Sequence, residues 1–200
     1  LQRMQKQAAA SSTQGAGSLS NAIWGGTFHA MASRLLRQHG KLIGLEPDFT
    51  VLDRSDSEDL LDVVRAELKL STERRRFPLK QTCLSIYSRC INSRAKLQII
   101  LEEVFPWCVD FEEELKQLFK GYVERKDRLN CLDYDDLLLF WNALVSDESG
   151  ARAIRKQFDC VLVDEYQDTN LLQSEILQHL CPAGTGLTVV GDDAQSIYSF

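Results

Sequence analysis

The stretch FDCVLVDEYQDTN, residues 158–170, decides the fold because it passes directly from an apolar run into a polar loop. Its apolar part, residues 158–163, is rich in β-branched side chains and predicts a short buried strand. Asn170 predicts a helix N-cap, with Gln173 three residues later completing a capping box. A second apolar run, LTVV at 187–190, predicts another buried strand. Strand, polar loop, helix and strand in this order are typical of a parallel α/β sheet.

Polar side chains follow each predicted strand, at the edge where parallel sheets bind their ligands. Asp164 is suited to a hydrated Mg²⁺, which keeps several waters and takes few protein carboxylates. Glu165 is suited to orient and deprotonate a water that attacks the γ-phosphorus of a nucleotide. Gln195, after the second strand, is placed to sense the γ-phosphate. An isolated acidic pair is more often a solvated strand end, so this interpretation depends on both loops occurring together.

The composition sets wide bounds on the class of protein. The 200 residues are 44% hydrophobic, enough for the core of one or two domains. The net charge of −6 gives no global basic character, yet residues 65–96 hold nine basic and two acidic side chains. This basic island indicates either contact with a polyanion or a solvated helical face. Its singled-out members are Arg74, Arg75, Arg76, Lys80, Arg89, Arg94 and Lys96.

Six cysteines are scattered without a CxxC pair or a matching histidine spacing. This argues against a zinc site and indicates free thiols in a reducing cytosol. Cys160 is expected inside the first buried strand. No apolar run approaches the ~18 residues of a membrane span, and no signal peptide opens the chain. We therefore expect a cytoplasmic protein without a membrane partner.

The centre of the chain is predicted to be helical, without strand alternation. AIWGGTF, residues 22–28, predicts a short strand before it. Helices are expected over residues 30–39, 53–70, 78–97, 109–129 and 133–145. Ser55 or Ser57 is expected to cap the second of these, and Asp133 or Asp135 the last. No chemistry is assigned to the acidic segment DYDDL.

Four motifs together resemble the UvrD/PcrA/Rep family of superfamily 1 DNA helicases. DEYQDTN (164–170) is similar to the family's Walker B motif, and GDDAQSIYSF (191–200) to its third motif. WGGTFHAMASRLLR (24–37) resembles the TFHS segment, and LDYDDLLLF (132–140) the LDFDDL segment. All four occur in the family's order, so the resemblance covers essentially the whole chain.

The resemblance implies a partial RecA-like P-loop NTPase domain with a parallel sheet and a mostly helical inserted subdomain. Motor-domain segments would occupy residues 1–30 and 131–200, and the insert residues 31–130. The cofactors would be ATP and Mg²⁺.

The resemblance also implies a role for each matching residue. Asp164 would serve Mg²⁺, Glu165 the attacking water, and Gln195 the γ-phosphate and its coupling to DNA.

Further residues would contact DNA by resemblance. Thr27, Phe28 and His29 would lie on the single-strand track. Tyr198 and Phe200 would stack on or pack beside bases, a contact worth ~1–3 kcal/mol per base. Core packing stays open as an alternative for Tyr198 and Phe200, as does a structural role for His29. The insert would lie over duplex DNA, where the basic island is placed to contact phosphates.

As implied by the resemblance, the full-length protein would couple Mg-ATP hydrolysis to 3′–5′ movement on single-stranded DNA and to unwinding. Its setting would be DNA repair or replication, with partner proteins from those processes. Alternatives are a subunit of a helicase–nuclease complex, a degenerate motor domain that binds DNA or protein, and a P-loop ATPase without a nucleic-acid partner.

The sequence contains no phosphate loop of the form GxxxxGK[ST]. GAGS at 15–18 lacks the lysine and a preceding strand. Ala194 stands where many relatives carry an acid. An arginine just beyond Phe200 and a second motor domain are expected outside the chain. The 200 residues alone are therefore expected not to hydrolyse ATP.

Overall fold

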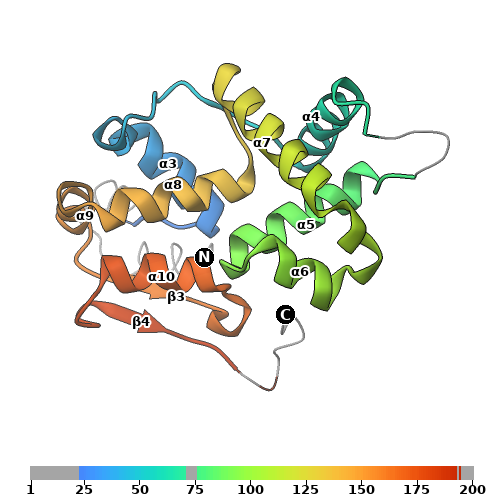
Figure 1. Ribbon diagram of the computed structural model, residues 1–200. Coiled ribbons are helices and arrows are strands. Elements are labelled where there is room, and N and C mark those ends of the chain that lie inside the picture. The colour runs from blue at the N-terminus through green and yellow to red at the C-terminus, as the bar shows by residue number, and fades with distance from the viewer. Residues whose placement is uncertain (1–22, 71–75, 193, 195–200) are drawn as a thin grey trace.

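The computed structural model describes residues 23–70, 76–192 and 194 (Figure 1). The helices and 3₁₀ turns are α3 (Phe28–His39), η1 (Gly40–Ile43), α4 (Arg54–Glu67), α5 (Lys80–Ser93), α6 (Leu97–Val104), η2 (Pro106–Phe111), α7 (Glu112–Arg128), α8 (Tyr134–Ser146), α9 (Glu148–Arg155), η3 (Tyr166–Asp168) and α10 (Leu171–Leu180). The strands are β1 (Thr50–Val51), β2 (Cys131–Leu132), β3 (Val161–Val163) and β4 (Leu187–Val189). The described part of the chain is mixed α/β, mostly helical, with short parallel sheets.

β3 and β4 pair in parallel, as the sequence predicted. Val161 lies opposite Leu187, and Val163 opposite Val189. α10 connects the two strands and lies alongside them (Figure 1). This crossover brings the two polar loops to the same edge of the sheet, because parallel strands end on the same side.

β1 and β2 form a second parallel pair that the sequence analysis did not predict. Thr50 lies opposite Cys131 and Val51 opposite Leu132. Each strand has two residues, too few for a visible alternation of apolar and polar side chains. The pair joins the two ends of the segment that carries α4 to α7. This helical segment therefore begins and ends at the same place in the fold.

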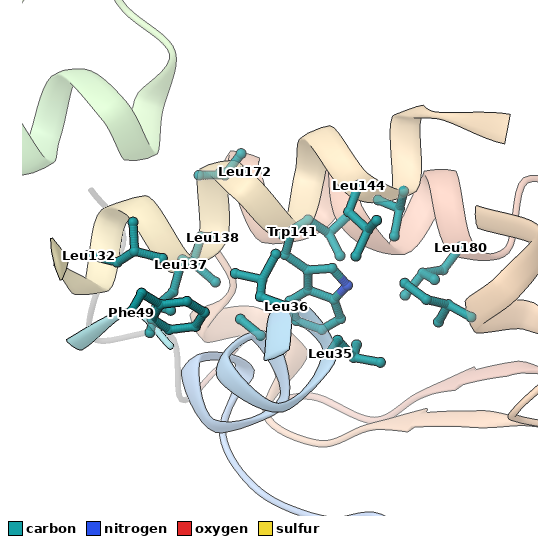
Figure 2. Close-up of a cluster of buried hydrophobic side chains, with 14 residues drawn as sticks. Leu35, Leu36, Phe49, Leu132, Leu137, Leu138, Trp141, Leu144, Leu172 and Leu180 are labelled. Carbon is teal, nitrogen blue, oxygen red and sulfur yellow. The ribbon is translucent and has the colours of Figure 1, made fainter. Parts of the chain in front are cut away.

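One hydrophobic cluster is built around α8, which packs against α3 and α10. Figure 2 shows Trp141 of α8 among the apolar side chains of this cluster. Its buried members are Ala32, Leu35, Leu36, Phe49, Leu132, Leu137, Leu138, Trp141, Leu144, Val145, Ile154, Leu172, Ile176 and Leu180. Burying each large side chain stabilises the fold by about 1.5–3 kcal/mol before the cost of chain ordering.

A second cluster is formed by α4, α5, α6 and α7 with η2 and the residues just before α5, and it holds the helical segment together. Its buried members are Leu61, Val64, Phe77, Cys83, Leu84, Ile86, Tyr87, Ile100, Leu101, Cys108, Leu115, Leu118 and Tyr122. α7 crosses α4 closely at Gly121, where a Cβ would lie 2.8 Å from Cγ1 of Val64. A side chain at this position would force the two helices apart.

The strand predicted over residues 22–28 is wrong for the described residues 23–28. α3 begins at Phe28, and Thr27 is its N-cap. The Thr27 hydroxyl accepts a hydrogen bond from the Ala30 amide at 3.3 Å, which satisfies one free N–H of the first turn. The Phe28 ring packs against Trp141 with ring centroids 5.9 Å apart. Capping and core packing together outweigh the strand propensity of the segment.

Two other helix boundaries differ from the prediction. Asp53, not Ser55 or Ser57, caps α4, and its carboxylate accepts from the Asp56 amide at 2.9 Å. The helix predicted over residues 78–97 ends at Arg94, whose left-handed φ of 57° separates α5 from α6.

The cap predictions for the other two helices are confirmed. Asp133 caps α8 in a capping box with Asp136. Asn170 caps α10 in a capping box with Gln173.

The strands β3 and β4 are less buried than predicted. Val163 is buried at 7% exposure, but its neighbour Leu162 is 56% exposed because successive strand residues point to opposite faces. Val189 is 45% exposed. Cys160 is exposed and precedes β3, so its predicted place in a buried strand is wrong.

The six cysteines are free thiols, as predicted. Within the described ranges, every helix is too short or too polar to cross a bilayer.

Candidate functional site

Two polar loops meet at the carboxyl edge of the β3–β4 sheet. The Val190 amide donates to the Val163 carbonyl at 2.8 Å, and the Tyr166 amide donates to the Val190 carbonyl at 2.9 Å. These two bonds extend the ladder past both strands. The loop that carries Asp164 and Glu165 is thereby fixed to the loop that follows β4.

Both carboxylates of the predicted site are exposed at this edge. Asp164 Oδ1 accepts a hydrogen bond from the Glu165 amide at 3.0 Å. The exposure and single backbone contact of Asp164 suit a carboxylate that binds a hydrated cation through water. Asp164 is therefore the residue that could hold Mg²⁺.

Glu165 has a left-handed backbone, with φ 53° and ψ 45°. For a residue with a Cβ, this backbone conformation is unfavourable by about 1–2 kcal/mol. The following 3₁₀ turn holds it there, since the Asp168 amide donates to the Glu165 carbonyl at 3.0 Å. The strain marks the turn that presents two adjacent carboxylates at one strand end.

Gln167 joins the two loops through its side chain. Its amide nitrogen donates to Oε2 of Glu165 at 2.5 Å. Its amide oxygen accepts from the Asp192 backbone N–H at 3.0 Å. The amide therefore orients the Glu165 carboxylate and ties it to the loop after β4.

Gly191 leaves the space in which this bridge forms. A Cβ at Gly191 would lie 2.6 Å from the Gln167 side-chain oxygen and 3.2 Å from the backbone nitrogens of Tyr166 and Gln167. Any other residue would push against the Gln167 amide. The first residue of the GDDAQSIY motif is thus explained by the first polar loop.

Three predicted site residues, Gln195, Tyr198 and Phe200, lie outside the described residues. The predicted approach of Gln195 to the acidic pair stays a prediction. The described chain on this side reaches Ala194, whose amide donates to Asp192 Oδ1 at 3.0 Å.

The predicted DNA segment at Thr27, Phe28 and His29 forms the start of α3. The Thr27 side chain is exposed, whereas Phe28 is half-buried against the first cluster. The His29 ring lies 5.3 Å from the ring of Tyr134, which is 46% exposed. Burial lowers the pKa of His29, and the Asp135 carboxylate acts in the opposite direction.

The basic island is partly neutralised by acids. Lys80 pairs with Asp59, and Arg94 pairs with Glu175 at 3.3 Å. Arg74 and Arg75 lie outside the described residues, and Arg76 is exposed. Arg76 and Lys96 are exposed members of the basic island.

A buried charge cluster at the junction of α7 and α8 was missed by the sequence analysis. The Lys126 ammonium contacts Asp133 Oδ2 and Asp136 Oδ2, each at 2.5 Å. Tyr122 donates to Asp133 at 2.8 Å, and Lys126 also lies 4.4 Å from the Tyr122 ring centroid. Lys126 is 2% exposed. The cluster joins the helical segment to α8.

Burial and the neighbouring Asp133 charge raise the pKa of Asp136 to about 6, against the pull of Lys126. Burial also raises the pKa of Asp135. The acidic pattern DYDDL was the available signal for this cluster, but its lysine comes from another helix and no local spacing points to it.

The geometry defines an α/β protein whose parallel strands carry an acidic, strand-end site. The family model of the UvrD/REP helicase N-terminal domain matches residues 2–200. The chain therefore belongs to the UvrD/REP helicase N-terminal domain family.

Curated relatives agree with this membership. The chain is 34% identical over 181 residues to the ATP-dependent DNA helicase PcrA of Leuconostoc citreum, covering 89% of this chain and 23% of the relative. It is 32% identical over 180 residues to DNA helicase II of Haemophilus influenzae, covering 89% and 24%. It is 31% identical over 186 residues to DNA helicase II of Escherichia coli, covering 92% and 25%. The chain thus spans about a quarter of the length of these relatives.

Proposed function

We propose that the chain is part of an ATP-dependent DNA helicase or translocase, in which a RecA-like domain couples ATP hydrolysis to 3′–5′ movement on single-stranded DNA and to unwinding. The observation that carries the proposal is the strand-end pair Asp164 and Glu165, with Gln167 holding the glutamate carboxylate. Family membership and the names of the relatives support the same reading.

Each side chain has a chemical task in this proposal. Asp164 would hold Mg²⁺ through water, and the bound cation would supply charge neutralisation for the phosphates. Glu165 accepts a proton from the water that attacks the γ-phosphorus. Gln167 keeps the acceptor oxygen of Glu165 in place, and Gln195 contacts the γ-phosphate.

DNA contacts are proposed for three segments of the chain. Thr27 and His29 contact the single strand at the start of α3, where a neutral, half-buried histidine donates one N–H to a phosphate. Phe28 serves mainly to fix this segment to Trp141. Tyr198 and Phe200 stack on bases. The helical segment with the basic island contacts duplex DNA through phosphates.

The proposed setting is the cytoplasm, with repair or replication proteins as partners. A phosphate loop and a second motor domain are expected in the full-length protein. Without them these residues supply half of one ATP site.

The test is ATP turnover by the full-length protein, with and without single-stranded DNA, at increasing Mg²⁺. We expect stimulation by DNA, and Asp164→Asn to raise the Mg²⁺ concentration for half-maximal turnover by about tenfold or more. DNA binding without turnover in the wild type would contradict the motor and favour a degenerate domain that only binds. Turnover with no response to DNA would favour a P-loop ATPase without a nucleic-acid partner.

A further inference from the structure

Helix α10 begins immediately after the loop that carries Asp164 and Glu165, called the acidic loop below, and it packs against α5 of the helical segment. The Asn170 side-chain nitrogen donates to the Asn92 side-chain oxygen at 2.7 Å. The two residues are 78 positions apart in sequence. The end of the acidic loop is therefore hydrogen-bonded directly to α5, one of the helices of the second hydrophobic cluster.

The hydrogen bonds continue from Asn92 into α8. The Asn92 nitrogen donates to Asp135 Oδ1 at 2.7 Å and to the Ser88 carbonyl at 2.8 Å. The Ser88 hydroxyl donates to the other oxygen of Asp135 at 2.5 Å. Asp135 is 8% exposed. Three elements, α5, α8 and α10, thus share one part-buried polar chain.

The direction of every bond in this chain is fixed. The Asn170 side-chain oxygen accepts from the backbone N–H of Gln173 at 2.9 Å, so the Asn170 side-chain nitrogen must face α5. Asn92 must then present its oxygen to Asn170 and its nitrogen to Asp135. If the Asn92 amide turned over, its oxygen would meet the Asp135 carboxylate and the Ser88 carbonyl. The hydrogen bonds among Asn170, Asn92, Ser88 and Asp135 therefore allow only one arrangement of these side chains, which makes the contact specific as well as stabilising.

We propose that Asn170 and Asn92 are positioning residues that fix the acidic loop to the helical segment, so that the placement of Glu165 depends on where α5 lies. This inference rests on the proposed function for its consequence in turnover, and on the contacts alone for its structural part. Through these hydrogen bonds, DNA bound to the helical segment acts on the hydrolytic site.

The variant Asn170→Asp isolates the bridge from the cap. An aspartate keeps the oxygen that accepts from the Gln173 amide, and aspartate caps helices as well as asparagine does. Its second oxygen faces the Asn92 oxygen, and the bridge is lost. Gln173→Glu is the matched control, because it adds the same charge to the same helix end. It also retains the side-chain oxygen that accepts from the backbone N–H of residue 170 at 3.0 Å.

The first readout is hydrogen exchange in the full-length protein, which needs no activity. We expect Asn170→Asp to raise exchange about tenfold in the amides of residues 166–170 and at the end of α5, whereas Gln173→Glu leaves them near wild type. Equal exchange in the two variants would overturn the positioning claim. This result holds whether or not the protein hydrolyses ATP.

The second readout is DNA-stimulated ATP turnover. We expect Asn170→Asp to lower kcat about tenfold with KM for ATP within about twofold, since a shifted base slows the chemical step more than it weakens binding. Asn92→Leu should lower kcat similarly, and the double variant should fall no further than either single one. Additive losses, or a kcat equal to that of Gln173→Glu, would overturn the proposal. Wild-type protein without turnover would contradict the proposed function instead, while the exchange result still decides the bridge.

Discussion

The side-chain nitrogen of Gln167 donates to Oε2 of Glu165 at 2.5 Å, while the oxygen of the same amide holds the loop after β4 through Asp192. A carboxylate that acts as a base must keep one orientation relative to its water. Gln167 supplies that orientation from the next residue but one. The glutamine of DEYQDTN therefore connects the two loops that the sequence analysis expected at one edge of the sheet.

Replacing Gln167 by leucine should lower DNA-stimulated kcat of the full-length protein by about tenfold to a hundredfold, because the Glu165 carboxylate loses its partner. KM for ATP should change little. Gly191→Ala should act in the same direction, since its Cβ would meet the Gln167 oxygen at 2.6 Å. Steady-state kinetics of both variants measures the effect. A kcat equal to wild type in Gln167→Leu would show that the bridge does not orient the base.

Replacing Lys126 by methionine should destabilise the α7–α8 junction by about 3–5 kcal/mol, because Asp133 and Asp136 remain buried without their shared cation. Hydrogen exchange of the α7 and α8 amides in the full-length protein measures this local free energy. Lys116→Met is the control. Lys116 pairs with Glu112 and Glu113 on the exposed side of α7 and should show no measurable change. Equal exchange in the two variants would contradict the assignment of the buried cluster.

The stability of the same junction should depend on pH through Asp136. Its pKa is raised from 3.8 to about 6 in the folded protein, so the folded state binds this proton more tightly than the unfolded state. The free energy of opening should therefore fall as pH rises from about 4 to about 6, and level off above. Asp136→Asn retains an oxygen for the capping box and should flatten this dependence. A rise in stability over this window that Asp136→Asn abolishes would contradict the raised pKa.

Reversing the charge of Arg74, Arg75 and Arg76 should flatten the salt dependence of duplex binding. Each lost phosphate contact lowers the slope of log K against log salt by about 0.9. Binding of a duplex at several salt concentrations measures the slope. Lys116→Glu, at a lysine that already pairs with Glu112 and Glu113, should leave the slope unchanged. A wild-type slope in the triple variant would show that the basic island is a solvated face.

Local signals predicted the framework of the site. The apolar runs at 158–163 and 187–190 contain the observed strands, and their parallel pairing followed from the helix between them. Asn170 was found as a cap because Gln173 follows three residues later, and Asp133 was one of the two cap candidates for α8. Both polar loops were expected at one edge, and the described parts of both lie there.

Interactions between distant residues were not predictable in this way. The bond between Asn170 and Asn92 spans 78 residues, and neither asparagine has a neighbour that suggests the other. Lys126 lies in a helix rich in charged residues, where nothing local separates the one buried lysine from the exposed ones. The strand predicted at 22–28 failed because Phe28 packs on Trp141, a contact between α3 and α8.

The central claim is that Glu165 activates the water that attacks ATP. The most direct measurement is a pair of assays on Glu165→Gln in the full-length protein: ATP affinity, and ATP turnover with single-stranded DNA. The substitution keeps the shape of the side chain and removes its ability to accept a proton. We predict ATP affinity within about threefold of wild type and turnover reduced at least about a hundredfold. Turnover near the wild-type rate would contradict the account, because the base would then lie elsewhere.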